Sequence, residues 1–427
     1  MYWQELTTGI YPWDIHDEGI ENILDNLQQK AGNNAAYMLA LMHYEKRPLH
    51  ANYYPHNPVR KRYLAEDSRV YFTIHDEMYK NSRIKPLPTD RDFLKGTDWL
   101  ETFSKALRKR GMRVGAEISH TPLDSQRGGT EFYDCIQKDI YGNPPGLNHY
   151  WKNSLMTNQQ LCWNSPDARA YVCSVAADIV RHYDIDMIQT CSVLYNPGYL
   201  DVHPLLGVVM GGCFCPHCER EARAQGLDWD GITAEVRHLA DIISRRTLAS
   251  QEDLHLLLQG DSSDTMLLLE YPQLFQWLQF RCKSVTRYLK ELSQAIHAEN
   301  SKIDFRFNTC WHEAEMMGLS LKEVVPYVDS IRMMDYAEQT GDEERVLNKG
   351  KWLANVRRQA GESMPIIAGI APRAKATPDL IKKGIRAVAL GGADGLSYGF
   401  YDGATMENLC AIREGMEDME VQLKIKN

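Results

Sequence analysis

The chain has 427 residues, of which 44% are hydrophobic and 25% are charged, and its formal net charge is −9. These values are average for a globular protein, and the length suits a single (β/α)8 barrel domain over residues 1–427. The negative charge and the lack of a basic stripe argue against nucleic acid as a partner. No apolar run reaches the roughly 18 residues of a membrane span, so we expect no membrane partner.

The first residues, Met1 to Leu6, lack the basic region and apolar core of a secretory signal. We therefore expect a cytoplasmic protein, or one from which a leader has been removed. The chain holds ten cysteines, which is too few for a disulfide scaffold at this length. Because several of these thiols are clustered, a reducing compartment and a metal site are favoured over disulfides.

Short apolar runs alternate with amphipathic helical stretches, as in parallel β/α units. The runs predict eight strands, which is the number in a closed (β/α)8 TIM barrel. They cover residues 35–42, 70–75, 112–119, 186–193, 303–311, 330–335, 365–370 and 395–398. Residues 226–300 are too many for one crossover helix, so they predict a helical insertion between the fourth and fifth strands.

Polar, ionisable and aromatic residues concentrate at the predicted C-terminal ends of these strands, where such barrels carry their chemistry. Histidines there are expected to bind sugar hydroxyls, Trp311 and Tyr401 to stack on a sugar ring, and Arg373 to pair with a substrate carboxylate. The residues assigned to substrate binding are His43, Glu45, His75, His120, Asn308, Trp311, His312, Tyr336, Arg373, Tyr398 and Tyr401.

Three cysteines lie within six residues, in Cys213-Phe214-Cys215-Pro216-His217-Cys218. This spacing is typical of metal ligands, and a tetrahedral thiolate set favours structural zinc. Four sulfur ligands leave no open position for a substrate, so such a site would brace a loop. The residues alone leave the fourth ligand open between Cys162, His217 and Cys191.

Residues 162–218 resemble the metal-binding region of glycoside hydrolase family 42, the β-galactosidase barrels. The matching segments are Cys162-Trp163-Asn164-Ser165-Pro166 and the loop from Cys213 to Cys218, while residues 327–336 and 392–398 resemble the family's sixth and eighth strands more weakly. The resemblance implies a TIM barrel, a carbohydrate substrate, and one zinc ion bound by Cys162, Cys213, Cys215 and Cys218. It also favours a homo-oligomer, because family 42 relatives often assemble.

The chain departs from that family at both catalytic positions. The family's fourth strand ends Gln-Thr-Asp-Asn-Glu, with the glutamate as the proton donor, whereas here Gln189 and Thr190 lead to Val193 at the donor position. The family's nucleophilic glutamate ends the seventh strand, and residues 365–373 contain no carboxylate. A glycosidase built on this chain therefore uses other carboxylates.

Glycoside hydrolysis needs one protonated carboxyl and a second carboxylate. Glu117 and Asp335 are the preferred pair, because each ends an apolar strand, where partial burial raises a carboxyl pKa. The third and sixth strands lie well apart in the ring, which favours an inverting reaction. Asp76 is the leading substitute as a catalytic residue.

Three other classes of function fit the same residues. In a metal-dependent sugar isomerase or aldolase, Glu117, Asp335 and the strand-end histidines would bind a catalytic divalent ion. In a uronate lyase, a histidine or tyrosine would remove the proton next to a uronic carboxylate. In a non-catalytic barrel, the same residues would bind sugar without cleaving it.

Overall fold

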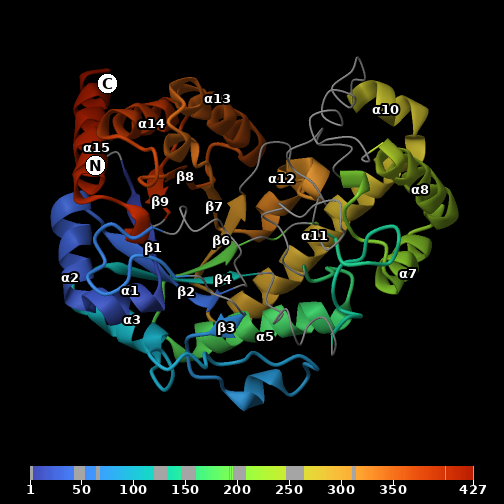
Figure 1. Ribbon diagram of the computed structural model, residues 1–427, viewed down its shortest axis with the longest axis horizontal. Coiled ribbons are helices and arrows are strands. Elements are labelled where there is room, and N and C mark those ends of the chain that lie inside the picture. The colour runs from blue at the N-terminus through green and yellow to red at the C-terminus, as the bar shows by residue number, and fades with distance from the viewer. Residues whose placement is uncertain are drawn as a thin grey trace.

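The structure is a computed structural model that describes residues 3–42, 53–63, 68–119, 132–145, 160–191, 193, 195, 208–246, 264–309, 314–399 and 401–426. Within these residues, eight parallel strands form a ring in the order β1-β9-β8-β7-β6-β5-β4-β2, which the pairing of β1 with β2 closes. The strands are β1 (Glu5–Ile10), β2 (Ala35–Met42), β4 (Arg113–Ser119), β5 (Met187–Cys191), β6 (Asp304–Thr309), β7 (Ser330–Met333), β8 (Ile366–Ile370) and β9 (Gly395–Tyr398). The predicted (β/α)8 TIM barrel is therefore confirmed (Figure 1).

The prediction of a barrel strand over 70–75 is wrong, and the first barrel strand is β1. Only β3 (Arg69–Val70) forms in that segment, and it pairs with β2 in the antiparallel direction. Residues 70–72 are apolar because they are buried in the core outside the ring. The strand β1 gave no apolar signal, because its buried side chains Glu5 and Thr7 are polar.

Helices cover the outside of the ring. They are α1 (Pro12–Glu18), α2 (Ile20–Asp25), α3 (Trp99–Lys109), α5 (Pro166–His182), α7 (Pro216–Ala224), α8 (Trp229–Arg246), α10 (Asp264–Glu270), α11 (Pro272–Glu299), α12 (Leu321–Val324), α13 (Glu343–Ala360), α14 (Pro378–Leu390) and α15 (Met406–Lys426). Shorter turns are η1 (Asn26–Ala31), η3 (Asp76–Tyr79), η5 (Ala314–Met317), η6 (Val325–Tyr327), η7 (Ala337–Thr340) and η8 (Tyr401–Gly403). Four of the helices begin at side chains that accept a backbone N–H of the first turn, which fixes where they start: Asp98, Ser165, Asp342 and Thr377.

Between β5 and β6 the described residues form α7, α8, α10 and α11. The long helix α11 packs along α5, as the crossover helix of a barrel does, while α7, α8 and α10 lie together at the far end of the molecule from α14 and α15 (Figure 1). None of the helices in the described ranges combines the length and the apolar character needed to cross a bilayer.

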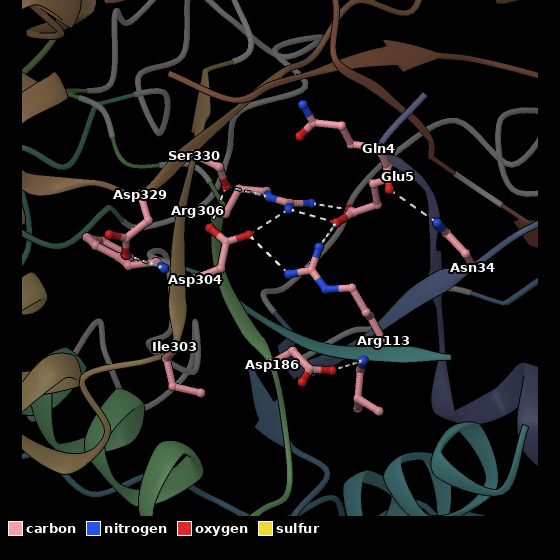
Figure 2. A network of polar contacts seen from close by, with 12 residues as sticks. Gln4, Glu5, Asn34, Arg113, Asp186, Ile303, Asp304, Arg306, Asp329 and Ser330 are labelled. Carbon is pink, nitrogen blue, oxygen red and sulfur yellow. Dashed lines mark hydrogen bonds and ion pairs between the residues drawn. The ribbon is translucent and has the colours of Figure 1, made fainter. Parts of the chain in front are cut away.

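The N-terminal end of the barrel interior is closed by a network of charged side chains (Figure 2). Arg306 in β6 is 1% exposed, and its guanidinium donates to both carboxylate oxygens of Glu5 at 2.6 and 3.1 Å. The same guanidinium donates to Asp304 at 2.7 Å and to the Ser330 hydroxyl at 2.9 Å. Arg113 adds a second cation, 2.6 Å from Glu5. This end of a TIM barrel normally serves stability, so we assign the network a structural role.

The pKa of Glu5 shows how strongly the neighbouring arginines stabilise the charged form of this carboxyl. Burial alone would raise this pKa, but Arg306 and Arg113 outweigh the effect, and the pKa lies below its ordinary value. Because the folded-state pKa is below the unfolded one, the stabilisation is present above the unfolded pKa and is lost as pH falls through the folded pKa.

We predict that Glu5→Gln lowers the free energy of unfolding by about 3–5 kcal/mol, because it leaves the charge of buried Arg306 only partly compensated. Denaturant unfolding near neutral pH measures this change. Glu101→Gln is the control, since Glu101 forms an exposed pair with Lys105 and its loss should cost less than about 1 kcal/mol. Equal effects of the two substitutions would contradict a structural role for the network.

Candidate functional site

Glu117 in β4 is a buried acidic side chain of the barrel interior, toward the C-terminal end of its strand. It is 6% exposed and accepts a hydrogen bond from the Gln189 amide, and the two residues are register partners in β4 and β5. Side chains alternate along β4, so Arg113 belongs to the lower network and Glu117 lies above it. The alternation along β4 thus places the Glu117 carboxyl inside the barrel, toward the C-terminal ends of the strands, where TIM barrels carry their chemistry.

Arg332 in β7 is a buried cation at the level of Glu117, above the Arg306 network. We call this the upper level of the barrel interior. It is 2% exposed, its Nε donates to the Ser397 hydroxyl at 2.7 Å, and its guanidinium lies 5.5 Å from the centre of the Tyr37 ring. Burial raises the pKa of Tyr37 to about 12, so the phenol stays neutral. Tyr336 lies close by, since a Cβ added to Gly399 would be 3.3 Å from both Tyr336 and Arg332.

The pKa of Glu117 is raised above its ordinary value. Burial is the largest cause, and it outweighs the opposing influence of Arg332, Gln189 and Cys191. The carboxyl therefore keeps its proton to a higher pH than an exposed glutamate does, which is the property of a general acid.

Three buried polar atoms near Glu117 have no hydrogen-bond partner among the described residues. They are Oε1 of Gln189, Oδ1 of Asn308 and Nη2 of Arg332, which belong to the consecutive strands β5, β6 and β7. Buried polar atoms in folded proteins are almost always paired with protein, water or ligand. Two acceptors and one donor beside a protonated carboxyl can therefore receive a polar ligand.

Asp335 follows β7 and is 6% exposed, and its Oδ1 accepts the backbone N–H of Ala337 at 2.8 Å. It lines a cavity of about 340 Å³ together with residues of α13 and the residue that caps this helix, namely Asp342, Glu344, Arg345, Asn348 and Lys349. The groups that act on the Glu117 carboxyl are Arg332, Gln189 and Cys191, and Asp335 is not among them. The structure thus places Asp335 toward α13 and Glu117 inside the ring.

Asp76 and His75 lie on the outer face of the barrel, because the strand expected to carry them to its mouth does not form. Asp76 is exposed and forms an ion pair with Lys85 at 3.1 Å. His75 and His182 both place Nδ1 on one oxygen of Asp178, at 2.7 and 2.9 Å, and their rings stack 3.6 Å apart. These three residues are near enough together to share an ion, but Asp178 already occupies the Nδ1 atom of both histidines. We assign the cluster to the packing of η3 on α5.

Three predicted binding residues lie at the ends of β8 and β9. Arg373 is 8% exposed, donates to Gln339 at 2.8 Å, and lines a cavity of about 550 Å³. Tyr398 and Tyr401 are completely buried, so the prediction of an open stacking face on Tyr401 is not met in this structure. The predicted residues His43, Glu45, His120, Trp311 and His312 lie outside the described residues.

A group of carboxyls at the ends of β1 and β9 was not predicted. Asp14 is fully buried, and its pKa is raised well above the ordinary value by burial and by Asp402. Glu18 accepts hydrogen bonds from Tyr401 and His56, each at 3.0 Å. A signal was present in the sequence, because Pro12 and Asp14 are typical of a first helical turn and would have indicated a strand before them.

The four cysteines predicted as ligands are brought together. Their sulfur atoms all lie within 4.8 Å of one another, and no cysteine of the four is more than 1% exposed. Cys215 caps α7 and Pro216 begins it, which places Cys218 on the first helical turn. Cys162 comes shortly before Ser165, the cap of α5, so the starts of two helices converge on the cluster.

The distances and the surroundings of the cluster fit a bound metal ion. Cys162 lies 3.4 Å from Cys215 and 3.6 Å from Cys218, and four sulfurs bound at zinc–sulfur distance would lie about 3.8 Å apart. The backbone N–H of Lys138 donates to Cys213, and the amide of Asn164 donates to Cys218. A buried four-cysteine cluster of this kind could hold a metal ion.

No family model matches the sequence, and no curated protein does. Solved structures with a similar fold include the PgaB (BpsB) glycoside hydrolase domain from Bordetella bronchiseptica, with a TM-score of 0.58, 14% identity, and 97% of each chain covered. A β-galactosidase from Halorubrum lacusprofundi has a TM-score of 0.58 and 13% identity, over 98% of this chain and 58% of its own. The α-L-fucosidase isoenzyme 2 from Paenibacillus thiaminolyticus has a TM-score of 0.56 and 13% identity, over 98% of this chain and 50% of its own.

The chain thus matches the whole length of the first of these proteins and between a half and three-fifths of the other two. At such low identity the likeness establishes the fold. These three solved structures are named as a glycoside hydrolase domain, a β-galactosidase and an α-L-fucosidase.

We predict that Cys215→Ser lowers the bound metal from about one ion per chain to a small fraction, because one of four thiolates is lost. Elemental analysis of the purified protein measures the metal. Cys173→Ser is the matched control, since Cys173 lies on α5 outside the cluster, and it should keep the full metal content. Equal metal in both variants would contradict a four-cysteine metal centre.

Proposed function

We propose that the chain is a glycoside hydrolase in which Glu117 donates the proton to the departing sugar. The observation that carries the proposal is a buried carboxyl of raised pKa, inside a TIM barrel, beside unpaired polar atoms of Gln189, Asn308 and Arg332. The glycoside hydrolases of similar fold support the reaction class.

In this proposal each side chain of the upper level has a separate task. Protonated Glu117 transfers its proton to the glycosidic oxygen as the bond to the anomeric carbon breaks. A water molecule forms the new bond to that carbon, and its proton passes to the second carboxylate. Arg332 then stabilises the carboxylate that remains, since its charge already acts on Glu117. The unpaired atoms of Gln189 and Asn308 accept hydrogen bonds from sugar hydroxyls.

We propose Asp335 as the second carboxylate, because it directly follows β7, the strand that carries Arg332, and it is buried. Asp335 lines the cavity beside α13, so this role requires bound substrate and the residues after β7 to bring the carboxylate toward the sugar. A separation wide enough for a water between the two carboxyls favours inversion.

We further propose that the four cysteines bind zinc and that this zinc is structural. Four thiolates fill the tetrahedral shell and leave no position for a substrate. The bound ion would join the start of α5 to the start of α7 and so fix the segments that follow β5. The four-cysteine pattern is also the basis on which we relate the chain to family 42.

We predict that Glu117→Gln lowers kcat/KM about 10²- to 10⁴-fold, because the amide cannot donate the proton. A panel of aryl glycosides of several sugars, followed by initial rates, identifies the substrate and measures the loss. Activity of the wild type should fall as the pH rises through the raised pKa of Glu117, and Asp335→Asn should lower the rate by a similar factor.

Asp76→Asn is the control for this series, because Asp76 is exposed on the outer face, and its rate should stay within about twofold. Full activity of Glu117→Gln would end the assignment of the acid. If activity is lost in Glu117→Gln but kept in Asp335→Asn, Asp335 is not the second carboxylate. Asp14 and Asp402 would then be the first carboxyls to test for that role.

Chelation distinguishes hydrolysis from a metal-dependent isomerase. Within the described residues, the groups of side chains that could hold a metal ion include neither Glu117 nor Asp335, while His43, His120 and His312 lie outside those residues. We therefore predict that brief treatment with EDTA, with the cysteine-bound metal retained, leaves turnover within about twofold of its starting rate. A second metal that the chelator removes together with activity would contradict the hydrolase and favour the isomerase.

A further inference from the structure

Arg281 on α11 is a buried cation without a hydrogen-bonded partner. It is completely buried, and none of its three guanidinium nitrogens has a hydrogen-bond acceptor among the described residues. Its guanidinium lies 4.5 Å from the centre of the Trp277 ring and 4.9 Å from that of Tyr195. Buried arginines are normally paired with an anion, so these aromatic faces alone leave its charge uncompensated.

After burial, the ionisable side chains that act most strongly on the Arg281 guanidinium include two cysteines of the cluster. They are Tyr195, Cys282, Cys213 and Cys218. The contacts are also joined through Asn164, whose amide donates to the Tyr195 hydroxyl and to the Cys218 sulfur, at 3.3 Å in each case. Arg281 and the four cysteines therefore form one buried group.

A second buried cation is the amine of Lys138, a residue that contacts the cluster. The Lys138 amine is buried without a hydrogen-bond acceptor among the described residues and sits over the Tyr133 ring. The backbone N–H of the same residue donates to Cys213 at 3.4 Å. Four thiolates with one divalent ion carry a net charge of −2, which these two cations would balance.

We propose that Arg281 is the counter-ion of a thiolate-bound divalent metal, and that it is retained in the core to hold the metal on the four cysteines. This inference rests on the proposed metal at the four cysteines. Without the metal–thiolate group, the buried charge of Arg281 has no hydrogen-bonded partner among the described residues. Arg281 therefore stabilises the loaded chain and destabilises the metal-free chain.

The test uses the full-length protein with its bound metal and the variants Arg281→Met and Arg281→Lys. Methionine removes the charge and keeps much of the apolar volume, while lysine keeps the charge and is the matched control. A chromogenic chelator added to the loaded proteins measures release of zinc. We expect zinc affinity to fall about 10- to 100-fold in Arg281→Met and to stay near wild type in Arg281→Lys.

Thermal unfolding of loaded and zinc-depleted protein separates a charge effect from lost packing. We expect Arg281→Met to lower Tm of the loaded protein and to raise Tm of the depleted protein. A fall of Tm in both states by a similar amount, with unchanged zinc release, would overturn the proposal and leave Arg281 as a packing residue.

Two further outcomes are distinguishable. Wild type purified from zinc-supplemented medium without any metal would refute the metal centre itself, and not only the counter-ion. If Arg281→Met is recovered only unfolded, the folding and zinc content of Arg281→Lys test whether a positive charge is needed at this position. Zinc-loaded, folded Arg281→Lys supports the need for charge at this position, whereas failure of Arg281→Lys to fold contradicts it.

Discussion

The fold depends on how a closed ring of eight strands accommodates charge in its interior. Two arginines, Arg306 and Arg332, occupy the interior at two levels, where water cannot screen them. At the lower level Glu5, Asp304 and Ser330 satisfy Arg306 on every side, and that end of the barrel is closed. At the upper level Arg332 faces a single carboxyl, and polar atoms are left over. In the proposed function, this difference separates the structural end of the barrel from the end that receives the substrate.

The same contrast explains which strands the sequence could reveal. Seven predicted strands overlap strands of the barrel, because their outward residues are apolar and form a continuous run. The strand β1 was missed because Glu5, which belongs to the interior network, and Thr7 are polar, so its apolar run is too short. Residues 70–72 are apolar for a different reason, since they are buried in the core without forming a barrel strand. An apolar run indicates that a segment is buried, but burial alone does not identify a strand of the barrel.

The residues that carry chemistry were easier to predict than the directions in which their side chains point. Spacing indicated three of the four cysteines, and the resemblance to family 42 favoured Cys162 as the fourth. The rule that strand ends carry chemistry selected Glu117. Whether a side chain at a strand end faces the ring or a neighbouring helix depends on register and on the residues that follow, so Asp335 could not be oriented in advance. Arg332 and Arg281 were not selected either, because their importance comes from neighbours that only the fold provides.

We propose that the unpaired atoms above Arg306 bind a sugar whose glycosidic oxygen lies next to Glu117. A crystal structure with a non-cleavable oligosaccharide analogue would locate that sugar. We expect a Glu117 carboxyl oxygen about 2.6–3.2 Å from the glycosidic heteroatom, with sugar hydroxyls bonded to Gln189, Asn308 and Arg332. An analogue bound only in the cavity beside Arg373, or only in the cavity beside α13, would contradict this assignment.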